Sequence, residues 1–546
     1  MPDLRTLPEA LAEAAGADAG YIFVSNGSEV FRPYAEVERN AYGVARALAD
    51  AGLRRGDLVA LVLGDAEAFL STLFGASIAG VIPASVYPPA STADLQHYID
   101  LTSTTLRVSR ARAVVTTRAM APHFEAARGA LPDLAMVLAR EDLDAAPAAP
   151  DRLPALDDIA LVQFTSGSTA APKGVVLTHR NLSANIDAIN GPAGLATGDG
   201  DVALSWLPLN HDMGLVGMAL GPLYSARPGV LLPPSMFVKR PVEWLRAIAR
   251  HRGTISFAPH FAYDLCLRRI KERDLDGLDL SCWRVAGCGA EPIHPSTLEA
   301  FAARFAPAGF RATSFLPCYG LAEHVLAATF PPRERPLVVG LHRSTEADTT
   351  VALVSCGLPL PGHRIRIVDE QDNAVPEHLV GEIVLAGPSV MTGYYNQDEL
   401  TAETVRDGWL HTGDLGYLSG GELFVCGRAK DIIIVNGRKH HPQDLEWVVD
   451  DLPGVRRGRV VAFGEVEHGR PDRVVIVVEP SGTVAPNALI DAVRRRISDV
   501  FGLYVDEVAV VPSGTVGRTT SGKVQRAATK ARFQRGEFAS RVASEG

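Results

Sequence analysis

A stretch rich in serine, threonine and glycine separates two apolar runs in the first third of the chain. The run at 159–164 predicts a buried strand, and the run at 175–177 predicts a second strand that returns beside it. Between them the chain reads Thr-Ser-Gly-Ser-Thr from Thr165, and Pro-Lys-Gly at 172–174 is expected to turn the chain. Backbone N–H groups, hydroxyls and a lysine in such a loop can surround phosphate oxygens. A polar surface turn is the alternative explanation.

The composition is that of an ordinary globular protein. The chain has 546 residues, enough for several domains, of which 47% are hydrophobic and 21% charged. A formal net charge of −10 argues against general nucleic-acid binding and against a basic membrane-facing surface. The six cysteines are scattered without a CxxC pair, as in reduced proteins. We therefore expect a cytoplasmic protein that has no nucleic-acid partner.

Neither a signal peptide nor a membrane span is expected from the sequence. Residues 1–20 contain Asp3 and Glu9 and lack an apolar core. The apolar stretch at 73–86 is interrupted by Pro83 and is too short to cross a bilayer.

Helices and strands are expected to alternate through residues 20–160. The expected elements are helices at 34–52 and 66–80 and strands at 57–63, 80–86 and 111–117. Alternation of this kind predicts a largely parallel sheet covered by helices. Ligands of such sheets usually lie at the carboxyl ends of the strands, where the loop after residue 164 would also lie.

Further distinctive strings follow the loop along the chain. They are Leu204–Gly217, Val285–Pro292, Phe315–Glu323, Gly381–Asn396, Trp409–Gly416, Leu423–Glu446 and Arg518–Arg526. Taken singly, their polar residues have plain structural explanations. His211 would be a surface or core histidine, Glu323 a helix N-terminal acid and Asp414 a turn residue. Lys523 would belong to a basic loop near the C-terminus.

Together and in this order, the loop and the strings resemble the adenylate-forming superfamily, and within it the fatty acyl-AMP ligases. The resemblance implies an α/β fold with a large N-terminal domain of helix-covered mixed sheets, residues 1–429. A small mobile α+β domain, residues 430–546, is expected to turn about a hinge at Lys430. The segment at about 330–353 resembles the insertion that marks fatty acyl-AMP ligases, although it is somewhat shorter than is usual there.

The resemblance also implies which residues bind the nucleotide. Tyr319 would stack on adenine, Asp414 would accept hydrogen bonds from both ribose hydroxyls, and Glu323 would help to hold Mg²⁺. The full expected set for ATP and AMP is Thr165, Ser166, Gly167, Ser168, Thr169, Lys173, Gly289, Ala290, Glu291, Tyr319, Gly320, Asp414 and Arg428. Lys523 is expected to be catalytic, because it would contact the carboxylate and the α-phosphate as charge builds.

A second implied set concerns the acid that is activated. His211 would lie near the acyl carboxylate and is also expected to be catalytic. It would line an acyl pocket together with Phe257, Ala258 and Phe261, although both phenylalanines could equally be core residues. Amino-acid-activating relatives place an acid nearby to hold the amine, and no matching acid precedes His211. A plain carboxylic acid is therefore expected.

The reaction implied by the resemblance has two steps. A fatty acid attacks the α-phosphate of Mg·ATP to give acyl-AMP and pyrophosphate, and a phosphopantetheine thiol then takes the acyl group. Because no carrier sequence is visible after residue 521, the partner is expected to be separate: a holo acyl carrier protein, or the carrier domain of a polyketide or peptide synthase. Two alternatives stay open. One is a fatty acyl-CoA synthetase that releases acyl-CoA, and the other is a non-catalytic adenylate-binding relative.

Overall fold

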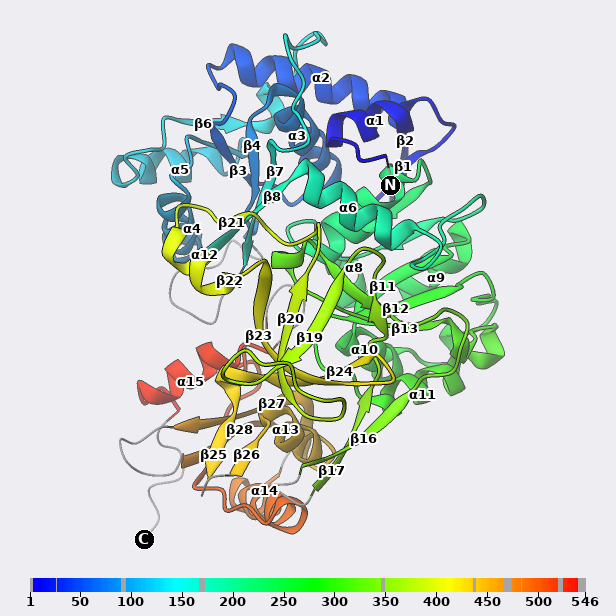
Figure 1. Ribbon diagram of the computed structural model, residues 1–546, viewed down its shortest axis with the longest axis vertical. Helices are drawn as coiled ribbons and strands as arrows, with labels where there is room; N and C mark the ends of the chain where they lie inside the picture. Colours follow the sequence, from blue (N-terminus) through cyan, green and yellow to red (C-terminus); the bar gives the residue numbers. More distant parts are fainter. Residues whose placement is uncertain are drawn as a thin grey trace.

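The computed structural model describes residues 3–25, 27–89, 95–165, 172–344, 349–435, 438–465, 473–482, 484–518 and 524–538. Residues before 430 form the larger part of the molecule, and residues after 430 form a smaller part at one end (Figure 1). We refer to these as the N-terminal part and the C-terminal part. Across the described residues, no helix combines the length and apolar character that crossing a bilayer requires.

One sheet carries the serine-rich loop. Its strand order is β21-β8-β7-β4-β3-β5-β6. The bounds are β3 Leu58–Val62, β4 Ile82–Ser85, β5 Ala113–Thr116, β6 Met136–Ala139, β7 Ile159–Thr165, β8 Lys173–Thr178 and β21 Gly393–Tyr394. Strands β3 to β7 are parallel, whereas β8 and β21 are antiparallel to their neighbours. The expected strands at 57–63, 80–86 and 111–117 are confirmed within a few residues.

The turn expected at 172–174 needs a correction. Lys173 pairs with Thr165, and Gly174 pairs with Phe164, so both residues already belong to β8. The apolar run after Gly174 is an extended strand. Its pairing with β7 begins earlier than expected, at Lys173. The lysine therefore projects from a strand end, which holds it more firmly than a turn would.

A second sheet brings several of the distinctive strings to one edge. Its order is β13-β12-β11-β9-β10-β1-β2, and all neighbours are parallel except β1 and β2. The bounds are β1 Gly20–Ser25, β2 Ser28–Pro33, β9 Ala203–Ser205, β10 Gly229–Leu231, β11 Ile255–Pro259, β12 Val285–Gly289 and β13 Phe315–Pro317. Because parallel strands end at the same edge, the residues that follow β9, β11, β12 and β13 lie near one another.

Helices cover both of these sheets. Those of the N-terminal part are α1 Leu7–Ala15, α2 Tyr34–Asp50, α3 Ala66–Ala79, α4 Leu95–Ser109, α5 Ala121–Ala127, α6 His179–Asn190, α7 Gly221–Tyr224, α8 Pro234–Lys239, α9 Val242–His251, α10 His260–Arg269, α11 Pro295–Phe305 and α12 Asp398–Thr404. Residues Met213–Leu220 form a π-helix, labelled η3. Residues Ala322–His324 form a short 3₁₀ turn, labelled η7.

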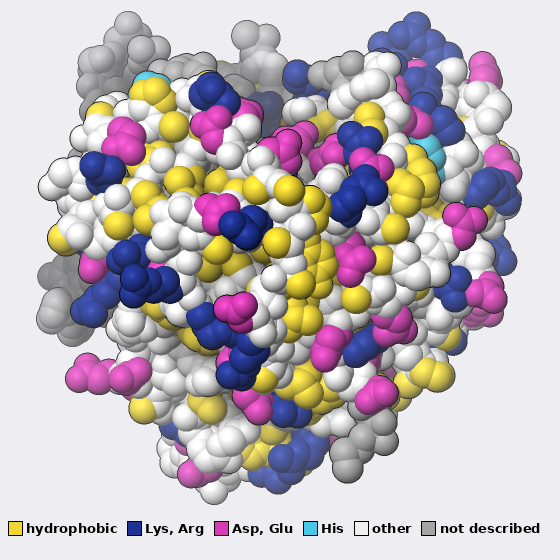
Figure 2. All heavy atoms as spheres, turned by 90° about the horizontal axis from the view of Figure 1, so that it is seen from above, with side chains coloured by type: hydrophobic (Ala, Val, Ile, Leu, Met, Phe, Trp, Pro, Cys, Tyr) yellow, Lys and Arg dark blue, Asp and Glu magenta, His cyan; other side chains and the backbone are white. Residues whose placement is uncertain are grey.

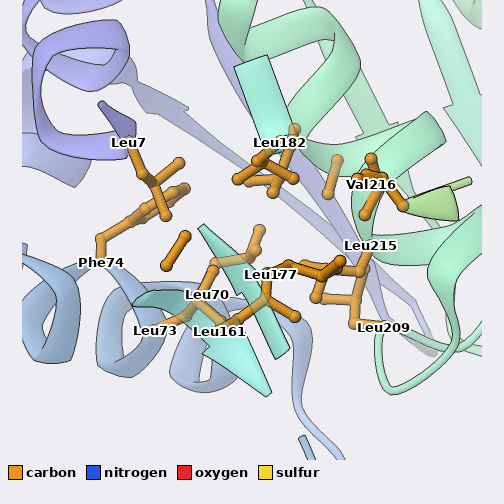
Figure 3. Close-up of a cluster of buried hydrophobic side chains, with 14 of the residues drawn as sticks. Leu7, Leu70, Leu73, Phe74, Leu161, Leu177, Leu182, Leu209, Leu215 and Val216 are labelled. Atoms are coloured by element: carbon orange, nitrogen blue, oxygen red, sulfur yellow. The ribbon is translucent and has the colours of Figure 1, made fainter. Parts of the chain in front are cut away.

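The core of the N-terminal part lies where these helices meet β7 and β8. Figure 3 shows leucine side chains from α1, α3, α6, both strands and η3 pointing toward one another. Leu7, Leu161, Leu177 and Leu182 are all fully buried or nearly so. Burying one such side chain contributes about 1.5–3 kcal/mol. This packing fixes the two strands that flank the serine-rich loop.

Smaller sheets complete the N-terminal part. They contain β14 Tyr319–Gly320, β15 Ala327–Phe330, β16 Val339–Ser344, β17 Thr349–Val354, β18 Leu358–Pro359, β19 Arg364–Val368, β20 Gly381–Ala386, β22 Val405–Arg406, β23 Trp409–Ser419 and β24 Glu422–Arg428. The antiparallel hairpin β16–β17 occupies much of the segment that resembles an insertion.

The C-terminal part is α+β. It contains β25 Ile433–Val435, β26 Arg438–His440, α13 Pro442–Asp450, β27 Val455–Glu465, β28 Arg473–Pro480, α14 Pro486–Phe501, β29 Glu507–Val510 and α15 Arg526–Gln534. A core around Ile433, Leu445 and Ile476 draws its buried residues from this part alone. The expected α/β class with helix-covered mixed sheets is confirmed, whereas the exact domain boundary stays a prediction.

The surface shows no extended region of one charge sign on the face seen from the top of Figure 1. Acidic and basic side chains alternate there around apolar patches (Figure 2). This mixture fits the modest net charge of −10.

Candidate active site

A cavity of about 1060 Å³ lies between the two parts of the chain, at the edge where the strands of the second sheet end. Residues from both parts line it. Of the residues singled out from the sequence, its lining includes Lys173, His211, Phe257, Phe261, Ala290, Glu291, Tyr319, Gly320, Glu323, Asp414, Arg428 and Lys430. The structure therefore brings together strings that are far apart in sequence, from Lys173 to Arg518.

Several predicted residues lie outside the described part of the chain. These are Ser166, Gly167, Ser168, Thr169 and Lys523, and only the backbone of Thr165 is described. Their assigned roles stay predictions. The described residues on either side of Lys523 lie at the site, because Arg518 and Val524 form an isolated bridge and both line the cavity.

Asp414 is held by two partners at the cavity wall. The Tyr319 hydroxyl donates to Asp414 Oδ2 at 2.8 Å, and Arg428 Nε lies 2.9 Å from Asp414 Oδ1. Asp414 is only 7% exposed. Burial and the nearby carboxylate raise the pKa of Tyr319 well above its usual range, so the phenol stays a neutral donor. The three side chains thus present a fixed carboxylate, suited to accepting hydrogen bonds from vicinal hydroxyls.

Glu323 lies on the short turn η7 and lines the same cavity as these three residues. A three-residue turn has almost no helix dipole, so the helix-terminus explanation considered for this acid does not apply. The hydroxyl of Tyr394 donates to Glu323 Oε1 at 2.8 Å, and the Met391 N–H donates to the Glu323 carbonyl at 2.9 Å. Glu323 is therefore fixed through both its side chain and its backbone.

The chemistry of this wall fits a magnesium ion carried by a nucleotide. Within the described residues, no three His, Cys, Asp or Glu side chains gather as metal ligands. Mg²⁺ is commonly held by one or two carboxylates together with substrate phosphates. The Glu323 carboxylate on the lining of a roomy cavity, with Lys173 on the same lining, matches that arrangement.

His211 is paired with the next residue. Its Nδ1 lies 2.5 Å from Asp212 Oδ1, and the two side chains are 15% and 13% exposed. Asp212 also accepts a hydrogen bond from the Met213 N–H at 2.7 Å at the start of η3. The carboxylate thus orients the imidazole, because the bond to Nδ1 fixes how the ring presents Nε2.

The apolar end of the cavity corrects one expectation. Phe257 and Phe261 line the cavity and also pack into the surrounding core, and their contact with an acyl chain stays a prediction. Ala258 is fully buried and is not part of the cavity lining among the described residues. Side chains alternate between faces along a strand, and Ala258 therefore faces away from the wall that Phe257 forms.

The glycine-rich string after β12 has a steric reason for its composition. A Cβ at Gly289 would lie 2.7 Å from Cys318 Sγ, so the strand ends can approach this closely only with glycine there. Gly289 itself is not on the described lining. Ala290 has φ +68, and Glu291 accepts a hydrogen bond from the Phe261 N–H at 2.5 Å. The Glu291 side chain thus has a structural partner, beyond the backbone role expected from the sequence.

Sequence reasoning gave no role to three side chains that hold the site. Tyr394 and Asp212 orient predicted residues, as described above. Glu382 accepts a hydrogen bond from the Gly413 N–H at 2.9 Å, directly before Asp414. Tyr394 and Glu382 both belong to the string Gly381–Asn396, which was distinctive but pointed to no chemistry on its own.

Comparison with known proteins places this site in a family. The family model of AMP-binding enzymes matches residues 11–395, and that of the AMP domain of Disco-interacting protein 2-like proteins matches residues 430–542. A putative acyl-CoA synthetase of Caulobacter vibrioides is 36% identical over 98% of this chain and 96% of its own length. The medium-chain-fatty-acid–[acyl-carrier-protein] ligase JamA of Moorena producens is 33% identical over 98% of this chain and 96% of its own.

Solved structures agree with this placement. A structure from a study of fatty acyl-adenylate ligases of E. coli and L. pneumophila has a TM-score of 0.91 and 36% identity, covering 98% of this chain and 99% of that one. The adenylation and carrier fragment of McyG, complexed with phenylalanyl-adenylate, has a TM-score of 0.89 and 27% identity, covering 99% and 85%. The chain therefore belongs to the AMP-binding enzyme family, and its resemblance to the fatty acyl-AMP ligases within that family is confirmed.

Proposed function

We propose that this enzyme of the AMP-binding ligase class is a fatty acyl-AMP ligase. It would activate a fatty acid with ATP and then pass the acyl group to the phosphopantetheine thiol of a separate carrier protein. The observation that supports the proposal is that one cavity is lined both by apolar side chains and by the residues we propose to bind phosphate and ribose. The apolar end includes Phe257 and Phe261, and the polar set includes Lys173, Asp414 and Arg428.

In the first step, the described residues would mainly position the reactants. Asp414 would hold the ribose, and Lys173 and Arg428 would offset phosphate charge. Glu323 would help to hold the Mg²⁺ that the nucleotide carries, and that ion would offset part of the phosphate charge. Lys523, on the loop whose flanking residues line the cavity, would reach the carboxylate and the α-phosphate.

The pair of His211 and Asp212 supports a plain carboxylic acid as the substrate. An amino acid would need a free carboxylate to hold its amine. Asp212 is already engaged by the His211 ring and by the Met213 N–H. Met213 and Gly217, one turn of η3 further on, line the same cavity and leave an apolar path for an alkyl chain.

The identity of the acyl acceptor is the finer part of the proposal. The JamA relative is named for transfer to an acyl carrier protein, whereas the Caulobacter relative is named as a putative acyl-CoA synthetase. Lys430 lies at the junction of the two parts, where we propose that the C-terminal part turns after adenylation to admit the thiol. A fatty acyl-CoA synthetase is the second candidate.

Product analysis separates the two candidates. The purified protein would be incubated with Mg·ATP and a mid-length fatty acid, alone, with coenzyme A, or with a holo carrier protein, and the products identified by mass spectrometry. We expect acyl-AMP that persists with coenzyme A and is consumed by the carrier. Rapid acyl-CoA formation would replace this proposal with the synthetase.

Matched variants test whether the protein's own site makes the product. Lys523→Ala should lower acyl-AMP formation by about 10²–10³-fold while sparing ATP binding, since it removes one preorganised charge contact. Lys530→Ala is the control, because Lys530 donates to the Gly464 carbonyl at 2.6 Å within the C-terminal part. Turnover of the Lys523 variant at the wild-type rate would contradict the assigned role.

A further inference from the structure

Tyr394 lies between two groups of opposite charge at the phosphate end of the cavity. Its hydroxyl donates to Glu323 Oε1 at 2.8 Å, and the Lys173 ammonium lies 5.1 Å from the centroid of its ring. The side chain is buried, with 5% of its surface exposed, yet it lines the cavity. One residue therefore contacts both the candidate metal-binding acid and the candidate phosphate-binding lysine.

The backbone around Tyr394 is fixed to β8, which carries Lys173, and to α12. Strand β21 pairs with β8, so that Tyr394 lies opposite Val175, two residues from Lys173. The Tyr395 N–H donates to the Gly174 carbonyl at 2.7 Å. The Tyr394 N–H donates to Thr401 Oγ1 at 2.8 Å. Movement of the ring relative to Lys173 is thereby restricted.

The chemistry of a phenol suits this position. The phenol hydroxyl is a donor that reaches the Glu323 carboxylate directly. A phenol donates a single hydrogen bond, which orients one carboxylate oxygen and leaves the other for a cation. The ring face attracts the Lys173 ammonium but leaves its charge in place, whereas a carboxylate at this position would neutralise that charge.

We propose that Tyr394 is a positioning residue that orients Glu323 toward a nucleotide-bound divalent cation and holds Lys173 beside it. The inference rests on the proposed function, because it assumes that the cavity binds Mg·ATP. It goes beyond that function by naming the group that sets the spacing between the metal-binding and the phosphate-binding side chains.

Tyr395 provides a matched control for a merely structural role. It is also partly buried, and its ring packs against a different apolar cluster around Phe164 and Val176. Burial raises the pKa of Tyr395, so its hydroxyl is protonated. If Tyr394 only maintained the packing around β21, Tyr394→Phe and Tyr395→Phe should have equal effects.

The experiment measures metal binding directly. Mn²⁺ would be titrated into the full-length protein with a non-hydrolysable ATP analogue, and free Mn²⁺ followed by electron paramagnetic resonance. Tyr394→Phe should weaken Mn²⁺ binding by about 10–100-fold, the usual effect of losing a partner of a metal ligand. Affinity for the analogue without metal should be unchanged. Tyr394→Leu, which also removes the ring, should weaken that metal-free affinity too, and Tyr395→Phe should behave as wild type.

A Glu323→Gln background tests whether the effect passes through the carboxylate. There, adding Tyr394→Phe should change Mn²⁺ binding by less than about 2-fold, because the carboxylate through which Tyr394 would act on the cation is already removed. This comparison holds even if Tyr394→Phe lowers the melting temperature. Unchanged Mn²⁺ affinity in Tyr394→Phe, or an equal loss in Tyr395→Phe, would overturn the inference. Wild-type protein that binds Mn·ATP but makes no acyl-AMP would overturn the proposed function alone.

Discussion

Pairs of side chains from distant parts of the sequence fix the individual residues of the candidate site. Tyr319 and Asp414 are 95 residues apart, and Tyr394 and Glu323 are 71 residues apart. The strings predicted which polar residues would gather, and many of them line one cavity, whereas their chemical roles stay predictions. Their partners could not, because a contact between remote strings depends on how the sheets bring them together, which no local pattern encodes.

A buried histidine at the start of α6 gives a prediction for stability. His179 is 1% exposed, and its Nδ1 accepts a hydrogen bond from the Leu7 N–H at 3.0 Å. Burial lowers its pKa from 6.5 to about 4. Between these values the unfolded chain binds a proton that the folded chain does not, so the free energy of unfolding should fall as the pH drops from 6.5 to 4. The loss should reach roughly 3 kcal/mol.

Urea denaturation at pH 7 and pH 4.5 measures this effect. His179→Gln keeps an acceptor near Leu7 and cannot titrate, so its stability should depend less on pH than that of the wild type. An identical pH dependence in the two proteins would show that His179 does not contribute.

Regular elements were the most predictable part of the fold. Helix α3, Ala66–Ala79, ends one residue before its expected end, and α2 ends at Asp50, two residues before the predicted stop. The π-helix η3 was not predicted, because an apolar segment such as 213–220 carries no periodicity that separates a π-helix from an α-helix. The hairpin β16–β17 was missed as well, since charged and turn-forming residues obscure its strands.

Helix η3 gives a prediction about the acyl chain. Gly217 lines the cavity, and a Cβ added there would lie 3.0 Å from Leu326 Cδ2, the flexible end of a side chain. Gly217→Val should therefore fold but fill space at the apolar end. Excluding about two methylenes costs about 1.6 kcal/mol, so the kcat/KM ratio of a short to a long fatty acid should rise about 15-fold.

Steady-state assays with a series of saturated fatty acids would measure that ratio. Gly129→Val is the control, because a side chain at Gly129 meets nothing within 4 Å. An unchanged chain-length profile in Gly217→Val would place the alkyl chain elsewhere.

At the scale of the whole molecule, α13 of the C-terminal part contacts the N-terminal part. The Gln443 amide donates to the Cys426 carbonyl in β24. The Trp447 ring meets His294 edge-on, with centroids 5.1 Å apart, and packs near Tyr417 and Phe424. The two-part organisation was expected from the sequence, whereas these contacts depend on an orientation that only the folded chain defines.

Removing the largest of these side chains should loosen the contact without unfolding either part. Trp447→Ala should increase hydrogen exchange in β24 and along the contacting face of α13. The adjacent Val448→Ala, which packs in the core of the C-terminal part, should instead increase exchange within that part. Mass-spectrometric hydrogen exchange on both variants would make the comparison. Unaltered exchange in β24 for Trp447→Ala would show that the tryptophan does not hold the parts together.

Because the two parts share the cavity, we expect the turnover rate to depend on how strongly they contact each other. Because both parts of the chain line the cavity, we expect product to leave faster when the parts separate. Each favourable contact between the two parts therefore helps to form the site and also slows release of the product. Selection for speed would keep such contacts weak and partly polar. Among the described residues they include the Gln443 amide, the edge-on ring contact of Trp447 and His294, the Arg518 guanidinium over the Phe261 ring, and the ion pair of Lys439 and Glu370. An engineered variant with a tighter junction should be more heat-stable and slower.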